Sequence, residues 1–115
     1  MPRQKLDNYL KTNRLRWGLS QQELGKLFDI CKDAVSKCEL GKRTPSVNVL
    51  LTSEMIFGLP PDKLFPVLYK SLQDKLGARA LALHTRLARR MDKASLRKRA
   101  LLEGIPGRTK NIPDV

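Results

Sequence analysis

The chain of 115 residues has few aromatic residues, two cysteines and one histidine. Aromatic residues make up 5% of the sequence, too few for the stacking surface that single-stranded nucleic acid requires. The two cysteines, Cys31 and Cys38, form no C-x-x-C pair, and the one histidine, His84, cannot complete a zinc site with them. On one helix the two cysteines would lie roughly 10 Å apart, too far for a disulfide. We therefore expect reduced thiols and no cofactor, with Cys31 as a candidate redox-sensing thiol.

Long apolar runs and catalytic motifs are also missing from the sequence. No stretch approaches the roughly 18 apolar residues that span a bilayer, and the first residues, MPRQKLDNYLK, lack the apolar region of a signal peptide. There is no internal repeat, no Gly-rich phosphate loop and no recognisable set of nucleophile, acid and base. These absences predict a cytoplasmic or nucleoid-associated binding protein that is not an enzyme.

Positive charge is abundant. The formal net charge is +12 and the pI is about 10.2. This balance favours a polyanionic partner, either nucleic acid or an anionic membrane surface.

The most informative stretch covers residues 19–46, LSQQELGKLFDICKDAVSKCELGKRTPS. Ser20 and Glu23 have the spacing of a capping box, which predicts the start of a helix. The buried face of this helix would carry Leu24, Leu27 and Phe28. Because Gly25 has no side chain, another helix could approach closely at that position. Asp29 follows, and aspartate tolerates the left-handed conformation of a sharp turn.

A second helix is predicted from about Lys32 to Leu40, with Gly41 after it. Its inward positions would be Ala34, Val35 and Cys38. Its outward positions would be Lys32, Asp33, Ser36 and Lys37. The basic loop Lys42, Arg43 and Thr44 comes next, before Pro45.

In order and spacing, these residues resemble the helix-turn-helix of the Cro and phage-repressor (XRE) family. The matching positions are Leu19, Ser20, Gln21, Glu23, Leu24, Ile30, Val35, Ser36, Glu39, Gly41, Arg43, Pro45 and Ser46. The resemblance covers about Leu6 to Phe65. It implies an all-α, five-helix DNA-binding domain over residues 1–65, whose third helix enters the major groove of double-stranded DNA.

The resemblance also implies roles for individual residues. Lys32, Asp33, Ser36 and Lys37 would face base edges, where lysine donates to guanine and aspartate accepts from cytosine. Gln21, at a helix N-terminus, would contact a phosphate and brace the third helix. Further phosphate contacts are expected from Arg14, Gln22, Lys42, Arg43 and Thr44. For Arg14, a solvated helix-end charge is an equal alternative.

The flanking helices follow from periodicity. Helix one is predicted over Leu6–Trp17, with Trp17 packed under the first two helices. Helix four would start with Ser46 as its N-cap and end at Gly58. Its buried face would carry Val47, Leu50, Leu51, Met55 and Ile56, and a short fifth helix would follow within residues 59–65.

From Pro66 the resemblance stops, and residues 66–107 read as a basic helical extension before a flexible tail, 108–115. Leucines at 64, 68, 72 and 76 form a narrow stripe, and Gly77 is expected to interrupt the helix. A further helix is predicted from Ala78 to Glu103, because helix-forming residues dominate there. One side of it would carry Leu83, Leu87, Met91 and Ala94.

Residues 77–115 hold ten Lys or Arg and three acids, a net charge of +7. Three interpretations stay open for this cluster: the solvated face of an oligomerisation helix, a second DNA contact, or a contact with an acidic partner or a membrane surface.

Two hypotheses for function follow. The first is a sequence-specific transcriptional regulator, repressor-like and homodimeric, that reads a palindromic operator. The alternative is a protein-interaction module, antitoxin-like or anti-regulator-like, that keeps the fold and binds a protein through Leu40 and the C-terminal helices. Salt-sensitive binding to duplex DNA discriminates between them.

Overall fold

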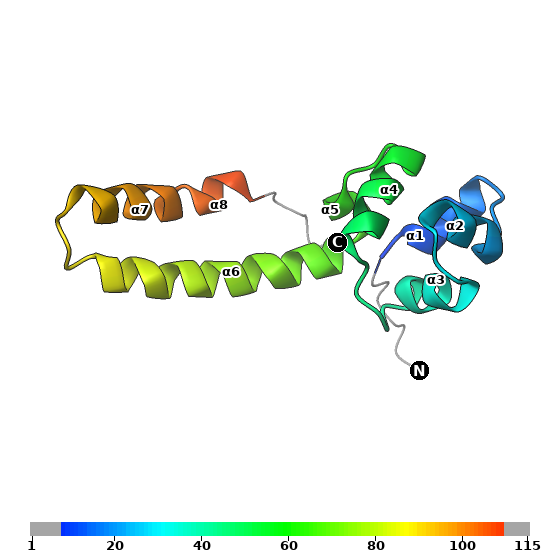
Figure 1. The fold of residues 1–115 in the computed structure, drawn as a ribbon, viewed down its shortest axis with the longest axis horizontal. Coiled ribbons are helices and arrows are strands. Elements are labelled where there is room, and N and C mark those ends of the chain that lie inside the picture. The colour runs from blue at the N-terminus through cyan, green and yellow to red at the C-terminus, as the bar shows by residue number, and fades with distance from the viewer. Residues whose placement is uncertain (1–7, 110–115) are drawn as a thin grey trace. The chain divides into compact units, whose positions relative to one another are not determined.

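The computed structural model describes residues 8–109, which contain helices and no strands, so the all-α prediction is confirmed for this part of the chain (Figure 1). The helices are α1 (Leu10–Arg16), α2 (Gln21–Phe28), α3 (Lys32–Glu39), α4 (Val47–Phe57), α5 (Pro61–Leu64), α6 (Pro66–Leu87), α7 (Lys93–Glu103) and α8 (Ile105–Arg108). No helix in this range combines the length and the apolar character that a membrane crossing requires.

The chain divides into two compact units after Tyr69, a point within α6. The first unit holds α1 to α5 and the start of α6, and the second holds the rest of α6 with α7 and α8. The domain boundary predicted from the sequence, after Phe65, lies a few residues earlier.

The first unit is built around one hydrophobic core to which all of its helices contribute. Burying such apolar side chains contributes about 1.5–3 kcal/mol each to the stability of the fold. This compensates for the low intrinsic stability of helices this short. The core residues are Leu10, Leu24, Phe28, Val35, Cys38, Val49, Leu64 and Phe65.

The start of α2 has the predicted capping box. The Glu23 backbone N–H donates to Ser20 Oγ at 3.0 Å, and the Ser20 N–H donates to Glu23 Oε1 at 2.8 Å. The hydrogen bond that the Ser20 N–H donates to the carboxylate is the main reason why the pKa of the Glu23 carboxyl is lowered, and the Ser20 side chain adds to this effect. The box satisfies two backbone donors that an uncapped helix would leave free.

The turn between α2 and α3 also follows the prediction. Asp29 adopts a left-handed backbone with φ of 60°, and its N–H caps the last turn of α2. Gly25 lies directly beneath this turn: a Cβ there would stand 2.7 Å from the Ile30 carbonyl oxygen. The absence of a side chain at Gly25 therefore lets the turn fold back onto α2, bringing α3 close to it.

Helix one is shorter than predicted, since α1 begins at Leu10, and Leu6 lies outside the described residues. Asn8 and Tyr9 are instead held by tertiary hydrogen bonds. The Asn8 side chain donates to the Cys38 carbonyl at 2.8 Å and accepts from the Leu10 N–H at 3.0 Å. The Tyr9 N–H donates to the Leu64 carbonyl at 2.8 Å. This segment thus joins α1 to α3 and α5 and does not extend the helix.

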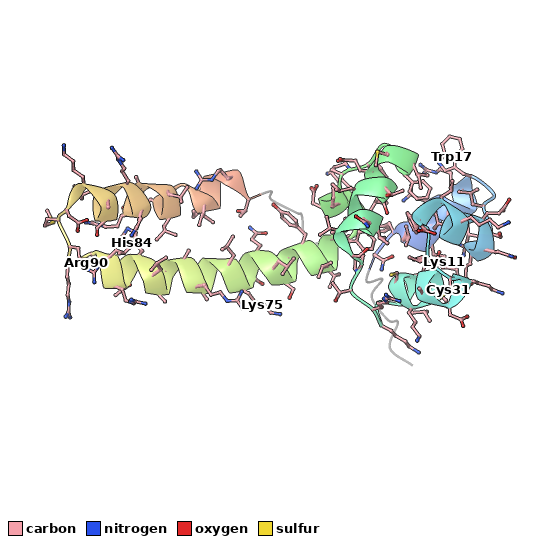
Figure 2. All side chains as sticks on the ribbon, in the orientation of Figure 1. Lys11, Trp17, Cys31, Lys75, His84 and Arg90 are labelled. Carbon is pink, nitrogen blue, oxygen red and sulfur yellow. The ribbon has the colours of Figure 1, made fainter. Side chains whose placement is uncertain are left out.

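Several side chains predicted to be buried are exposed. Trp17 is 69% exposed because it sits at the C-cap of α1, at the edge of the unit, so the prediction that it packs under the first helices was wrong (Figure 2). Leu27 on α2 is 52% exposed. On α4 the prediction was right for Leu50 and Ile56, which pack against the core, and wrong for Val47, Leu51 and Met55, which are exposed. Val49 and Ser53, which were not predicted, are the buried residues of this helix. The apolar residues of α4 are distributed over most of its circumference, so its sequence alone does not indicate which face is buried.

The second unit is a pair of antiparallel helical segments (Figure 1). Gly77 does not interrupt α6, which continues to Leu87, so that prediction was wrong. Asp92 caps α7, and helical structure continues past Gly104 into α8. Two polar contacts join the segments: His84 Nε2 lies 2.8 Å from Glu103 Oε1, and Gln73 Nε2 donates to Thr109 Oγ1 at 3.1 Å.

This second unit buries little apolar surface. Leu87 and Ser95 are its only buried residues among those described, and Met91 is 75% exposed in the turn before α7. The predicted common face of Leu83, Leu87, Met91 and Ala94 is therefore not formed. Exposed leucines remain on both segments: Leu72, Leu76, Leu81, Leu83, Leu96 and Leu101.

Candidate nucleic-acid interface

The outer face of α3 carries the four side chains predicted to read bases. Lys32, Asp33 and Lys37 are exposed and Ser36 is half-buried. Their spacing places them on one side of a helix, and the opposite side, with Ala34, Val35 and Cys38, is buried in the core. The predicted division of α3 into inward and outward positions is confirmed. An eight-residue helix is about 12 Å long, a length that the major groove of duplex DNA accommodates.

The basic loop that follows α3 is attached to the end of that helix. Gly41 turns the chain with φ of 74°. The backbone N–H groups of Lys42 and Arg43 then donate to the Lys37 carbonyl at 2.9 and 3.3 Å. Lys42, Arg43 and Thr44 are exposed. The loop cations therefore stand next to Lys37 on α3 and extend its positive charge.

Three helices are clamped together by the carboxylate of Glu39, at the end of α3. Arg14, from α1, donates to it from Nε at 2.6 Å and from Nη2 at 3.2 Å. Gln21, the first residue of α2, donates from Nε2 at 3.0 Å. The side chains of Arg14 and Glu39 are only 7% and 2% exposed. This buried network fixes how α3 lies against α1 and α2, and thus how its outer face is presented.

Gln21 therefore has the bracing contact with helix three that the resemblance implied. Gln21 is half-buried and Gln22 is exposed, both in the first turn of α2. Free N–H groups and the positive end of the helix dipole make such a turn favourable for an anion.

The expectation that Arg14 is an exposed cation was wrong. Its guanidinium is buried, and besides the two bonds to Glu39 it donates from Nη1 to the Leu19 carbonyl at 2.8 Å. The residue spacing alone gave no sign of this, because the partner lies 25 positions away. Arg14 consequently stabilises the domain and is not free to hold a phosphate.

The two cysteines occupy different environments on α3. Cys31 is exposed at the N-cap, where its side chain makes no capping hydrogen bond (Figure 2). Cys38 lies in the core, and burial raises the pKa of its thiol. Both thiols are free. A reagent from solvent reaches Cys31, next to Lys32, before it reaches Cys38.

Taken together, α3 and its loop form a surface that we call the α3 face: Lys32, Asp33, Ser36, Lys37, Lys42, Arg43 and Thr44. Four cations and one carboxylate give it a net charge of +3. Lysine and arginine donors can bind phosphates and guanine, while Asp33 can accept from cytosine. Sequence reasoning did not assign a role to Glu39 or Asn8, the residues that hold α3 in place. The available signal was that Glu39 is one of the positions that match the helix-turn-helix family.

Comparison of the chain with models of known families, with curated proteins and with solved structures gives no match.

Proposed function

We propose that this protein is a sequence-specific, double-stranded DNA-binding transcriptional regulator of the repressor type. In this proposal α2 and α3 act as a helix-turn-helix, and α3 enters the major groove. The observation that carries it is the α3 face, which presents donors and one acceptor outward while Glu39 holds the helix against α1 and α2. A rigidly held helix is what base reading requires, because hydrogen bonds to base edges depend on position.

The α3 face and the first turn of α2 have separate tasks in the proposal. Lys32, Asp33, Ser36 and Lys37 read bases. Gln21, Gln22 and the loop Lys42, Arg43 and Thr44 bind phosphates and set the register of the helix on the duplex. The net charge of +12 attracts DNA from a distance and contributes binding that does not depend on sequence.

The test begins with selection of bound duplexes from a random pool by the full-length protein. On the selected sequence, Lys37→Ala should cost about 1–3 kcal/mol, a loss of about 5- to 150-fold in affinity, and should spare non-specific binding. Lys63→Ala is the matched control, because Lys63 is an exposed cation on α5, outside the α3 face. Equal losses on every sequence, or no enriched sequence at all, would reject base reading by α3.

The proposed regulator works as a homodimer that pairs through the second unit. One helix-turn-helix covers a short half-site, so such proteins bind two half-sites about 34 Å apart. The exposed leucines of α6 and α7 and the exposed Met91 in the turn, with almost no buried core beneath them, are the feature that supports pairing. Covering them with a second copy would give the small unit the core that it lacks.

Analytical ultracentrifugation of full-length variants tests this part. Leu76 and Leu83 are 43% and 41% exposed, so replacing both by lysine should leave the monomer folded. We expect the double variant to become monomeric and to lose its preference for an inverted repeat over a half-site. The control is Leu51→Lys with Met55→Lys on the exposed side of α4. Dissociation by the α4 variant alone would move the dimer contact to the first unit.

A second candidate function rests on exposed apolar side chains in the first unit. Leu40, at the C-cap of α3, is 57% exposed, and Val47, Leu51 and Met55 line one side of α4. A protein partner would cover such a surface, as in an antitoxin-like or anti-regulator protein. Salt-dependent duplex binding that Lys37→Ala weakens favours the regulator. Duplex binding that is absent at low salt favours the interaction module.

A further inference from the structure

The most concentrated charge in the chain lies in the second unit, where α6 ends and α7 begins. Residues 86–99 contain seven cations and one acid, a net charge of +6. We call this segment the basic tip. Figure 2 shows Arg90 in the turn that follows α6, away from Lys75 in the middle of that helix. The cations are Arg86, Arg89, Arg90, Lys93, Arg97, Lys98 and Arg99, of which only Arg99 is half-buried.

Asp92, the one acid of the segment, offsets part of this charge and attracts Arg90 without forming an ion pair with it among the described residues. The carboxylate of Asp92 is occupied as the cap of α7, where it accepts from the Ser95 N–H at 3.1 Å and from Ser95 Oγ at 2.8 Å. Glu103 faces His84. Between Asp74 and Asp92 the sequence has no acid. None of the seven cations forms an ion pair within residues 8–109.

Folding gains nothing from this arrangement. Lys93 and Arg97 are both exposed and lie four residues apart on α7. Like charges at this spacing repel and destabilise a helix by a few tenths of a kcal/mol per pair. A solvated helix surface normally mixes both signs, which removes this cost. The segment therefore carries a charge excess that an external polyanion would relieve.

The composition of the basic tip selects the kind of polyanion. Five of its seven cations are arginine, whose planar guanidinium binds phosphate through two parallel hydrogen bonds. The sequence has no aromatic residue after Tyr69. This argues against stacking on single-stranded bases and against the aromatic anchors of a membrane-surface helix. The phosphate backbone of a duplex needs neither of these features.

We propose that the basic tip is a second, sequence-independent site for the phosphate backbone of duplex DNA, separate from the α3 face. It adds affinity and steers the protein toward DNA without reading bases. The inference does not depend on α3 as a reading helix, since none of the seven cations belongs to the first unit.

The experiment measures binding of the full-length protein to a 30-base-pair duplex of scrambled sequence by fluorescence anisotropy, over a series of salt concentrations. The test variant is Arg89→Gln with Arg90→Gln. The matched control, Lys75→Gln with Arg79→Gln, also removes two exposed cations from the second unit, but outside the basic tip. Circular dichroism confirms that both variants keep their helical content.

Each phosphate contact contributes about 0.9 to the slope of log affinity against log salt concentration. The tip variant should therefore flatten the slope by about 2, while the control keeps the slope of the unmodified protein. Equal slopes for all three proteins overturn the proposal. So does a tip variant that loses binding to vesicles of anionic lipid and keeps its duplex slope, because the tip would then be a membrane contact.

A third variant separates this proposal from the proposed function. Lys32→Gln with Lys37→Gln removes two cations from the α3 face. If α3 reads bases, this variant loses the preference for the selected sequence. The flattening caused by the tip substitutions should persist in its background. If the tip substitutions flatten the slope but no sequence is preferred, the regulator is rejected and the second site is kept. If a sequence is preferred but the tip substitutions leave the slope unchanged, the second site is rejected and the regulator is kept.

Discussion

Replacing Glu39 by alanine should destabilise the first unit more than any exposed acid does. The substitution removes three hydrogen bonds, of 2.6, 3.2 and 3.0 Å, from the buried carboxylate. Arg14 would keep only its bond to the Leu19 carbonyl, with its side chain 7% exposed. Its positive charge would then be buried without a counter-charge.

The expected loss is about 3 kcal/mol. Removing one partner of a buried ion pair costs about 3–5 kcal/mol, and the lower value applies because Gln21 is half-buried and lets water approach. A domain of this size has a stability of about 5–15 kcal/mol, so the loss is a large fraction of the total. It should also loosen α3 and thereby weaken the proposed binding to duplex DNA.

Urea unfolding followed by helical circular dichroism measures the effect, with the fluorescence of Trp17, at the C-cap of α1, as a second signal from the first unit. With a slope of about 1–3 kcal/mol per molar, the midpoint should fall by roughly 1–3 M. Glu54→Ala, an exposed acid on α4, is the control and should stay within about 0.5 kcal/mol. If Glu39→Ala matched Glu54→Ala, the network would not be what holds the helices together.

Three further predictions follow from single contacts. The pKa of Glu23 is lower in the folded protein than in the unfolded chain, so the folded state binds this proton less readily. The capping box therefore stabilises the folded state fully above the unfolded pKa, and this stabilisation is lost as the pH falls through the folded pKa. The difference in unfolding midpoint between the unmodified protein and Glu23→Gln should thus shrink from pH 7 to pH 3, and a constant difference would contradict it. Gly25→Ala should cost about 1–3 kcal/mol because its Cβ would meet the Ile30 carbonyl, whereas Gly77→Ala, with nothing within 4 Å, should stabilise α6 by about 0.5–1 kcal/mol in thermal unfolding. A thiol reagent should modify exposed Cys31 faster than buried Cys38, and Cys31→Ser should abolish the fast phase; two equal rates would contradict the burial.

The sequence by itself determined the local features of the first unit. The Ser20–Glu23 capping box, the left-handed Asp29 and the Ser46 cap of α4 each depend on residues a few positions apart, so their spacing is sufficient to predict them. The inward and outward positions of α3 were predictable for a similar reason, because its apolar residues occupy one side only.

Only the tertiary structure decided which side of α4 is buried, where α1 begins and what Arg14 does. The apolar residues of α4 are distributed over most of its circumference, so their spacing is compatible with more than one buried face. The start of α1 depends on contacts of Asn8 and Tyr9 with Cys38 and Leu64, far along the chain. From its residue type and position, Arg14 is expected to be a surface cation. It is instead buried, where it donates to a carboxylate on α3 and to a carbonyl before α2. These outcomes come from contacts between distant residues, which spacing along a single helix does not encode.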